Sequence, residues 1–184
     1  MFGLEKIFAK QAEAPQKGIE QVETENKELI KRTAREIAEK ILKDYENRPA
    51  DTMQQNSYLE RLGRNADNLA KRLEKDCAWV GHVIKRPDLK NKEIIHVVDG
   101  NINQDKESKW TAMVSFGCQE VLENGNRKLI PDTGILNRKP NLETEKEGKD
   151  WLEIRTTAFG EITKKFGGDK IEETEQLQKL ISKE

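Results

Sequence analysis

The segment YLERLGRNADNLAKRLEKDCAWVGHVI, residues 58–84, carries the strongest pattern in this chain. Its apolar residues recur at spacings of three and four: Leu59, Leu62, Ala66, Leu69, Leu73, Cys77, Val80 and Ile84. This spacing places them along one face of an α-helix, because three or four residues make about one helical turn. The segment therefore predicts a helix that buries this face, and the rest of the fold is built around it.

The opposite face of the same segment is polar and mostly basic. Its residues are Arg61, Arg64, Asn65, Asn68, Arg72 and Lys75, with Lys71 at the edge. A row of cations and amides can contact phosphates or acidic side chains, with an affinity that depends on salt. A solvated outer face has the same pattern, and the nearby Glu60, Asp67 and Glu74 partly neutralise the row. The arginines, Asn68 and Lys75 are the candidate binding residues, and both interpretations stay open.

An earlier segment, residues 17–45, predicts a first long helix. Its apolar residues also recur at spacings of three and four: Ile30, Ala34, Ile37, Ile41 and Tyr45. The helix is expected to end before Pro49, because a proline disfavours the α conformation of the residue before it. Asp51 or Thr52 is then a suitable N-cap for the second helix. Two long helices joined by so short a connection are expected to form an antiparallel hairpin.

Composition limits the class of protein. The 184 residues suit one domain, and 34% hydrophobic with 36% charged residues fits long, two-sided helices. The net charge of −1 excludes a strong overall attraction to nucleic acid or anionic membranes, so any such attraction must be local. Two distant cysteines and the lack of an apolar leader or an apolar run of membrane-spanning length predict a cytoplasmic protein.

The second half of the chain predicts a sheet. Strands are expected over residues 93–98, 109–122 and 127–130, the second from its alternating pattern and the third from the Asn124-Gly125 turn before it. Residues 101–108 and 131–147 are polar and predict loops. Residues 151–157 fit a strand or a helix, and Thr156 and Thr157 favour a strand followed by a short helix. A final helix is expected over residues 170–182.

These elements predict an α+β protein in which an N-terminal antiparallel helical hairpin packs on a small, mostly antiparallel sheet with a C-terminal helix. Residues 1–16 are expected to be a flexible or short amphipathic segment that Pro15 ends. Residues 17–86 form the hairpin, and residues 87–184 form the sheet and last helix in the same compact unit. Ile19 and Val22 lie in the part of the first helix that extends past the second helix of the hairpin. The apolar face is sparse there, so it is too weak for a strong coiled coil. This predicts a monomer or a weak homodimer.

Cys118, His96 and Asp99 are the candidate catalytic residues, because Cys118 and His96 fall on neighbouring predicted strands. The alternation argues for a structural role instead: Cys118 shares a face with Ala112, Val114 and Phe116, and an apolar surrounding makes a thiol inert. Nucleotide-binding glycine motifs and metal-ligand spacings are missing from the sequence. We therefore expect no cofactor and no metal.

The C-terminal tail combines acidic and apolar residues close to the chain end. They are Glu172, Glu173 and Glu175, followed by Leu177, Leu180 and Ile181. This block resembles the glutamate-rich signal near the end of substrates of type IVB bacterial secretion systems, and the resemblance implies export of the protein. Acidic residues at the start of a helix also interact favourably with the helix dipole, which explains the block without export.

The sequence thus predicts a non-enzymatic protein-interaction module, such as an adaptor, accessory factor or secreted effector-like binder, that acts through the surface of the hairpin. A nucleic-acid-binding accessory protein that uses the basic face of the second helix is the first alternative. A small Cys/His-dependent enzyme is the second alternative. A protein partner is expected in the first case, and nucleic acid in the second.

Overall fold

The computed structural model describes residues 5–47 and 66–182, with side chains from residue 26 onward. The helices are α1 (Glu5–Glu46), α3 (Ala66–Ile84), α4 (Glu145–Lys165) and α5 (Glu175–Ile181), with a short 3-10 helix η2 (Pro87–Leu89). The strands are β1 (Ile94–Gln104), β2 (Trp110–Val121), β3 (Arg127–Leu129), β4 (Ile135–Leu142) and β5 (Ile171–Glu173). Together they form an α+β fold with a mixed five-stranded sheet, which confirms the predicted fold class.

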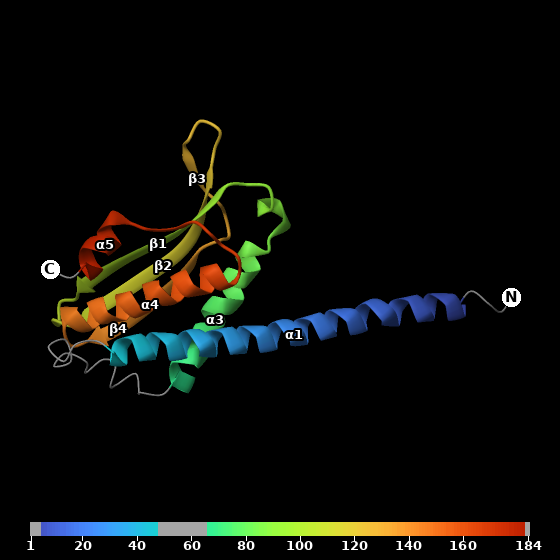
Figure 1. Ribbon diagram of the computed structural model, residues 1–184, viewed down its shortest axis with the longest axis horizontal. Helices are drawn as coiled ribbons and strands as arrows, with labels where there is room; N and C mark the ends of the chain where they lie inside the picture. Colours follow the sequence, from blue (N-terminus) through green and yellow to red (C-terminus); the bar gives the residue numbers. More distant parts are fainter. Residues whose placement is uncertain (1–4, 48–65, 183–184) are drawn as a thin grey trace.

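Helices α1 and α3 pack against each other as predicted and run in opposite senses, with α3 crossing α1 obliquely (Figure 1). Both predicted seams are buried: Ala34, Ile37, Ile41 and Tyr45 on α1, and Leu69, Leu73, Cys77 and Val80 on α3. Arg35 pairs with Asp67 at the start of α3, whereas Ile30 lies near Ala78 further along it. Residues 79–84, which also fit a strand, continue the helix to Ile84.

The N-terminal half of α1 projects away from the rest of the protein (Figure 1). The expected break at Pro15 is not seen, because α1 runs without interruption from Glu5. A proline inside a helix removes one backbone hydrogen bond and its ring crowds the carbonyl four residues earlier, so the helix is locally weaker at Pro15. The side chains of Ile19 and Val22, the proposed cap at Asp51 or Thr52, and residues 58–65 lie outside the described residues.

Helix α4 corrects the prediction of a strand over residues 151–157. Thr144 caps its start by accepting a hydrogen bond from the Glu147 N–H at 3.2 Å, and the Glu147 carboxylate accepts one from Glu143 N–H at 2.8 Å. This variant of a capping box begins the helix well before Thr156 and Thr157, the residues that favoured a strand. Every third or fourth residue is then buried, including Trp151, Ile154, Ala158 and Ile162. The energy of this buried face outweighs the modest strand preference of threonine.

The sheet has the order β3-β2-β1-β5, with β4 also paired to β2. β1 and β2 pair antiparallel over their whole length, so that His96 lies opposite Cys118. The expected loop over residues 101–108 begins later, because β1 continues to Gln104. The predicted C-terminal helix is also shorter: residues 171–173 form β5, parallel to β1, and α5 begins only at Glu175.

Strand β4 corrects the prediction of a loop over residues 131–147. It pairs antiparallel with β2, and Val114 lies opposite Asn137. It lies at an edge of the sheet and buries only Leu142 fully, so its sequence lacks the apolar alternation that identifies a strand. Pro140 is accepted because a proline in an edge strand loses no ladder hydrogen bond when its nitrogen faces away from the sheet.

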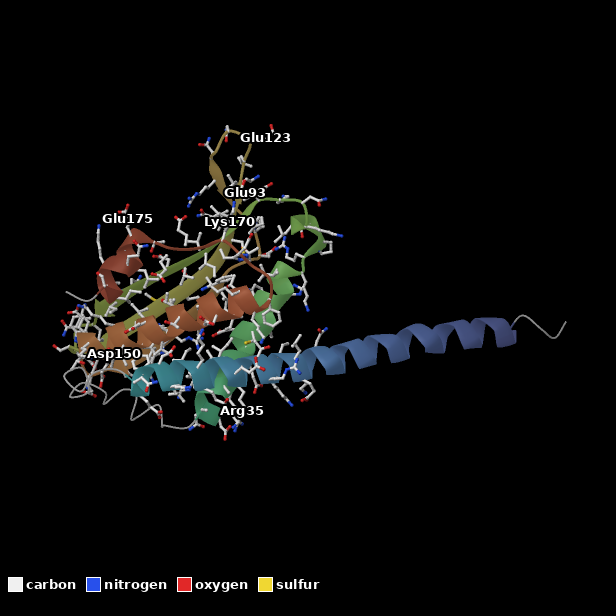
Figure 2. All side chains as sticks on the ribbon, in the orientation of Figure 1. Arg35, Glu93, Glu123, Asp150, Lys170 and Glu175 are labelled. Carbon is white, nitrogen blue, oxygen red and sulfur yellow. The ribbon has the colours of Figure 1, made fainter. Side chains whose placement is uncertain are left out.

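The core lies between the sheet and α4, and the hairpin packs on α4 from the other side (Figure 1). Phe116 of β2 is the centre of this core, stacked between His96 and Phe159 at ring-centroid distances of 5.7 and 5.4 Å. Ion pairs of Lys40 with Glu161 and of Lys165 with Glu36, both at 2.8 Å, join α1 to α4. Lys170 pairs with Glu93 beside the β2–β3 hairpin (Figure 2).

None of the helices in the described residues combines the length and the apolar character that a membrane crossing requires. The acidic tail block is folded into the body of the protein. Glu172 belongs to β5 and pairs with Arg127 at 2.8 Å, and Leu177 of α5 is completely buried. The block therefore contributes to the core and to the sheet surface, whatever its relation to export.

Candidate functional site: a basic groove between α3, β4 and α4

An open groove with a volume of about 370 Å³ lies where α3, β4 and α4 meet. Helix α3 lines it with Leu69, Lys71, Arg72 and Lys75, β4 with Asn137, Arg138 and Lys139, and α4 with Trp151, Ile154 and Arg155. Six of these ten residues are lysine or arginine. The basic face of the second helix thus forms one wall of a concave site, and the edge strand forms the other.

Among the residues that the structure describes, the cations on the two walls have no acidic partners. Lys71, Arg72 and Lys75 of α3, with Arg138 and Lys139 of β4, form no ion pair in the part of the chain that the structure describes. In contrast, Lys40 and Lys165, where α1 meets α4, and Arg127 on the sheet surface are paired with carboxylates. Unpaired cations on facing walls raise the local positive potential, which favours an anionic ligand.

The floor of the groove is apolar and well supported. Leu69, Trp151 and Ile154 are almost completely buried, with exposed fractions of 3%, 6% and 1%. Because the indole of Trp151 is covered, it offers no open ring face on which a nucleic-acid base can stack. The groove therefore combines cationic walls with an apolar floor, and this pairing suits an acidic chain that also carries apolar side chains.

A buried ion pair fixes the position of the walls. Arg155 of α4 donates to the carboxylate of Asp76 on α3, and Asn137 of β4 donates to the same carboxylate at 3.3 Å. Asp76 is 1% exposed and Arg155 is 6% exposed. Burial raises the pKa of Asp76, and Arg155 and Asn137 oppose this shift. Asp76 thus connects the three elements of the groove through one carboxylate.

The structure places the predicted binding residues as follows. Arg72 and Lys75 line the groove, whereas Asn68 is exposed on α3 and does not line it. Arg61 and Arg64 lie outside the described residues. Residue spacing does not predict the groove residues Lys139, Arg138 and Arg155. The first two belong to a segment interpreted as a loop, and Arg155 belongs to residues 151–157, which fit a strand or a helix. The sequence signal that could have pointed to this second wall is the pair of adjacent cations in Asn-Arg-Lys-Pro, residues 137–140.

The candidate catalytic pair does come together, but in the core. The Cys118 sulfur lies 3.3 Å from His96 Nδ1, and the exposed fractions of the two residues are 0% and 5%. Gly168 covers the histidine so closely that a Cβ added there would lie 2.8 Å from His96 Nε2. Burial raises the pKa of Cys118 to about 11 and lowers the pKa of His96. A neutral thiol that contacts a neutral imidazole is a core contact, not an activated nucleophile.

Asp99 does not complete a triad. It lies on β1 three residues after His96, so its side chain is on the opposite face of the sheet. There its carboxylate accepts a hydrogen bond from the hydroxyl of Thr174. The groups that face Cys118 are instead Thr133, whose Oγ1 accepts from Cys118 N–H at 3.0 Å, and His96.

Both cysteines of the native protein are expected to resist alkylation at neutral pH. Burial raises the pKa of Cys77 to about 12 and that of Cys118 to about 11 from an ordinary 9.0, so the thiolate of Cys118 is about a hundredfold rarer than in a free thiol. Iodoacetamide labelling followed by mass spectrometry measures the rate. The unfolded protein and the variants Cys77→Ala and Cys118→Ala are the controls. Fast labelling of native Cys118 would restore the enzyme hypothesis.

Histidine, cysteine and carboxylate side chains do not gather into a group of three or more that could hold a metal ion, as far as the described residues go. Comparison with known proteins found no matching family model, no matching curated protein and no matching solved structure.

Proposed function

We propose that this protein is a non-enzymatic interaction module that binds an acidic segment of a partner protein in the groove between α3, β4 and α4. The observation that carries the proposal is the convergence of Lys71, Arg72, Lys75 and Lys139 around an apolar floor, without acidic partners in the described part of the chain. Opposite charge on the walls steers and orients the ligand, and contact of its apolar side chains with the aliphatic stems of the wall lysines adds affinity.

The groove favours an acidic peptide over a nucleic acid for one specific reason. Single-stranded nucleic acids gain much of their sequence-tolerant affinity from bases stacked on exposed aromatic rings. Among the described lining residues the one aromatic side chain is Trp151, and it is 6% exposed. A peptide needs no stacking platform, because its carboxylates pair with the lysines and its apolar side chains can lie along the aliphatic stems of those lysines.

A fluorescently labelled peptide of alternating glutamate and valine is expected to bind the full chain, with an affinity that falls as salt is added. The double variant Arg72→Glu/Lys75→Glu should weaken binding at least about tenfold, because hydrogen bonds to charged groups contribute about 1.5–3 kcal/mol each. Fluorescence anisotropy measures the dissociation constant.

The matched control is Lys106→Glu/Lys128→Glu. It reverses two exposed lysines outside the groove and changes the net charge by the same amount. Equal loss of binding in both double variants would show that only net charge matters, and would contradict the proposal. A single-stranded oligonucleotide serves as the second ligand. Tighter binding of the oligonucleotide, abolished by Arg72→Glu/Lys75→Glu, would assign the groove to nucleic acid instead.

A further inference from the structure

Within the described residues, strand β4 leaves one row of backbone groups without partners. Within β2, odd-numbered residues direct their backbone groups to β1, as the Val121 N–H donated to Glu93 O shows. Even-numbered residues direct theirs to the other side, as the Cys118 carbonyl shows by accepting from Ile130 N–H. This alternation is a property of every antiparallel ladder, so it fixes which residues of β4 face β2.

The register of β4 follows from that alternation. Ile135, Asn137 and Lys139 lie opposite the even-numbered Phe116, Val114 and Ala112, and therefore bond to β2. Leu136 and Arg138 consequently direct both their N–H and C=O groups to the outer edge of the sheet. In residues 5–47 and 66–182, no other backbone group bonds to this edge. Leu136 is also 65% exposed and Arg138 is exposed, so solvent reaches both residues.

We infer that the partner's acidic segment binds as an extended strand added to the outer edge of β4. This inference rests on the proposed function and specifies how the same groove is used. An added strand satisfies the free N–H and C=O groups of Leu136 and Arg138, which is the usual way in which a sheet edge recognises an extended peptide. Arg138 already lines the groove, so the free edge and the cationic walls belong to one site.

The pleat of the sheet predicts the pattern of the ligand. Successive side chains of a strand point to opposite faces, and residues directly opposite one another share a face. On one face lie Lys139 and the cations of α3, which call for acidic side chains. On the other face lie Leu136, beside Ser115 of β2, and Arg138, two residues further along. The side chain of Leu136 is largely uncovered and calls for an apolar neighbour. The ligand therefore carries acidic residues on the groove face and an apolar residue opposite Leu136, as in a segment in which acidic and apolar residues alternate.

Pro140 limits the length of the pairing. It directs no N–H to the outer edge, and the next residue, Asn141, has a positive φ of 59° where the pairing with β2 shifts its register. A bulge of this kind bends the strand and ends regular pairing. The added strand therefore bonds to Leu136 and Arg138 and ends near Pro140, so affinity depends on the charged walls as well as on the ladder.

Amide hydrogen exchange of the full chain, with and without the peptide of alternating glutamate and valine, tests this inference. Without peptide, the N–H groups of Asn137 and Lys139 should exchange slowly and those of Leu136 and Arg138 fast. Saturating peptide should slow exchange at Leu136 and Arg138 by at least about tenfold, because their amides become hydrogen-bonded. Arg138→Pro should weaken binding about tenfold more than Arg138→Ala, because it also removes one edge donor.

The outcomes separate the two proposals. Binding that is weakened by Arg72→Glu/Lys75→Glu but leaves exchange at Leu136 and Arg138 unchanged overturns the strand pairing and retains the groove. Absence of binding overturns both. Circular dichroism of Arg138→Pro confirms that the fold is kept. The exchange measurement on the unaltered protein decides the inference even if that variant does not fold.

Discussion

Replacing Asp76 by alanine is expected to lower the free energy of unfolding by about 3–5 kcal/mol, which is the usual effect of removing one member of a buried ion pair. Asp76 is 1% exposed and accepts hydrogen bonds from both Arg155 and Asn137. Without its carboxylate, Arg155 keeps a buried charge that has lost this partner, and α3 loses its link to β4. Urea unfolding followed by circular dichroism measures the change.

Two further variants separate charge from shape at this position. Asp76→Asn keeps the size of the side chain but removes the charge, so it should be less stable than the wild type and more stable than Asp76→Ala. Asp76→Leu/Arg155→Met should recover much of the loss, because apolar replacement of a whole buried pair is often close to neutral. A loss below about 1 kcal/mol for Asp76→Ala, the range of exposed ion pairs, would show that the pair does not hold the groove together.

Replacing Phe116 by alanine is expected to have an effect of similar size, about 3–5 kcal/mol, because it leaves a cavity in the centre of the core. Phe116 is 1% exposed and stacks on both His96 and Phe159. Such stacked rings contribute about 0.5–1.5 kcal/mol beyond the area that they bury. Thermal and urea unfolding measure the effect.

The matched controls for this substitution lie on the same strand and on its neighbour. Phe116→Met retains most of the volume and should cost about 1.5 kcal/mol or less. Leu129→Ala on β3 removes an apolar side chain that is 68% exposed, and should change stability by no more than about 0.5 kcal/mol. Equal losses for Phe116→Ala and Leu129→Ala would mean that the centre of the core lies elsewhere.

The sequence predicted those parts of the fold in which one periodic pattern decides the structure. The seams of α1 and α3 and the alternating face of β2 were identified because each buries one continuous face, and the burial of Cys118 followed from the parity of its strand. The start of helix α4 was not predicted, because Thr156 and Thr157 favoured a strand and because the capping residues Thr144 and Glu147 lie in the segment interpreted as a loop. Local residue preference is weaker than the burial of a helical face.

The groove was predicted only on the side of α3. Arg72 and Lys75 belong to a helix whose faces can be assigned from spacing, so their exposure was predictable. Lys139 and Arg155 reach the groove through tertiary contacts of β4 and α4 that no local pattern encodes. The Cys118–His96 contact was foreseen from strand pairing, but the cover that Gly168 provides comes from a distant turn.

The short free edge of β4 also bears on how this protein behaves when concentrated. A growing fibril requires long, flat strands whose edges pair without end, and natural sheets avoid this with prolines, bulges and charged edges. Here Arg138, Pro140 and the bend at Asn141 interrupt one edge, and β5 at the other edge spans only Ile171–Glu173. The sheet can therefore present a recognition edge without being a template for aggregation, and solutions of the folded protein should stay free of amyloid.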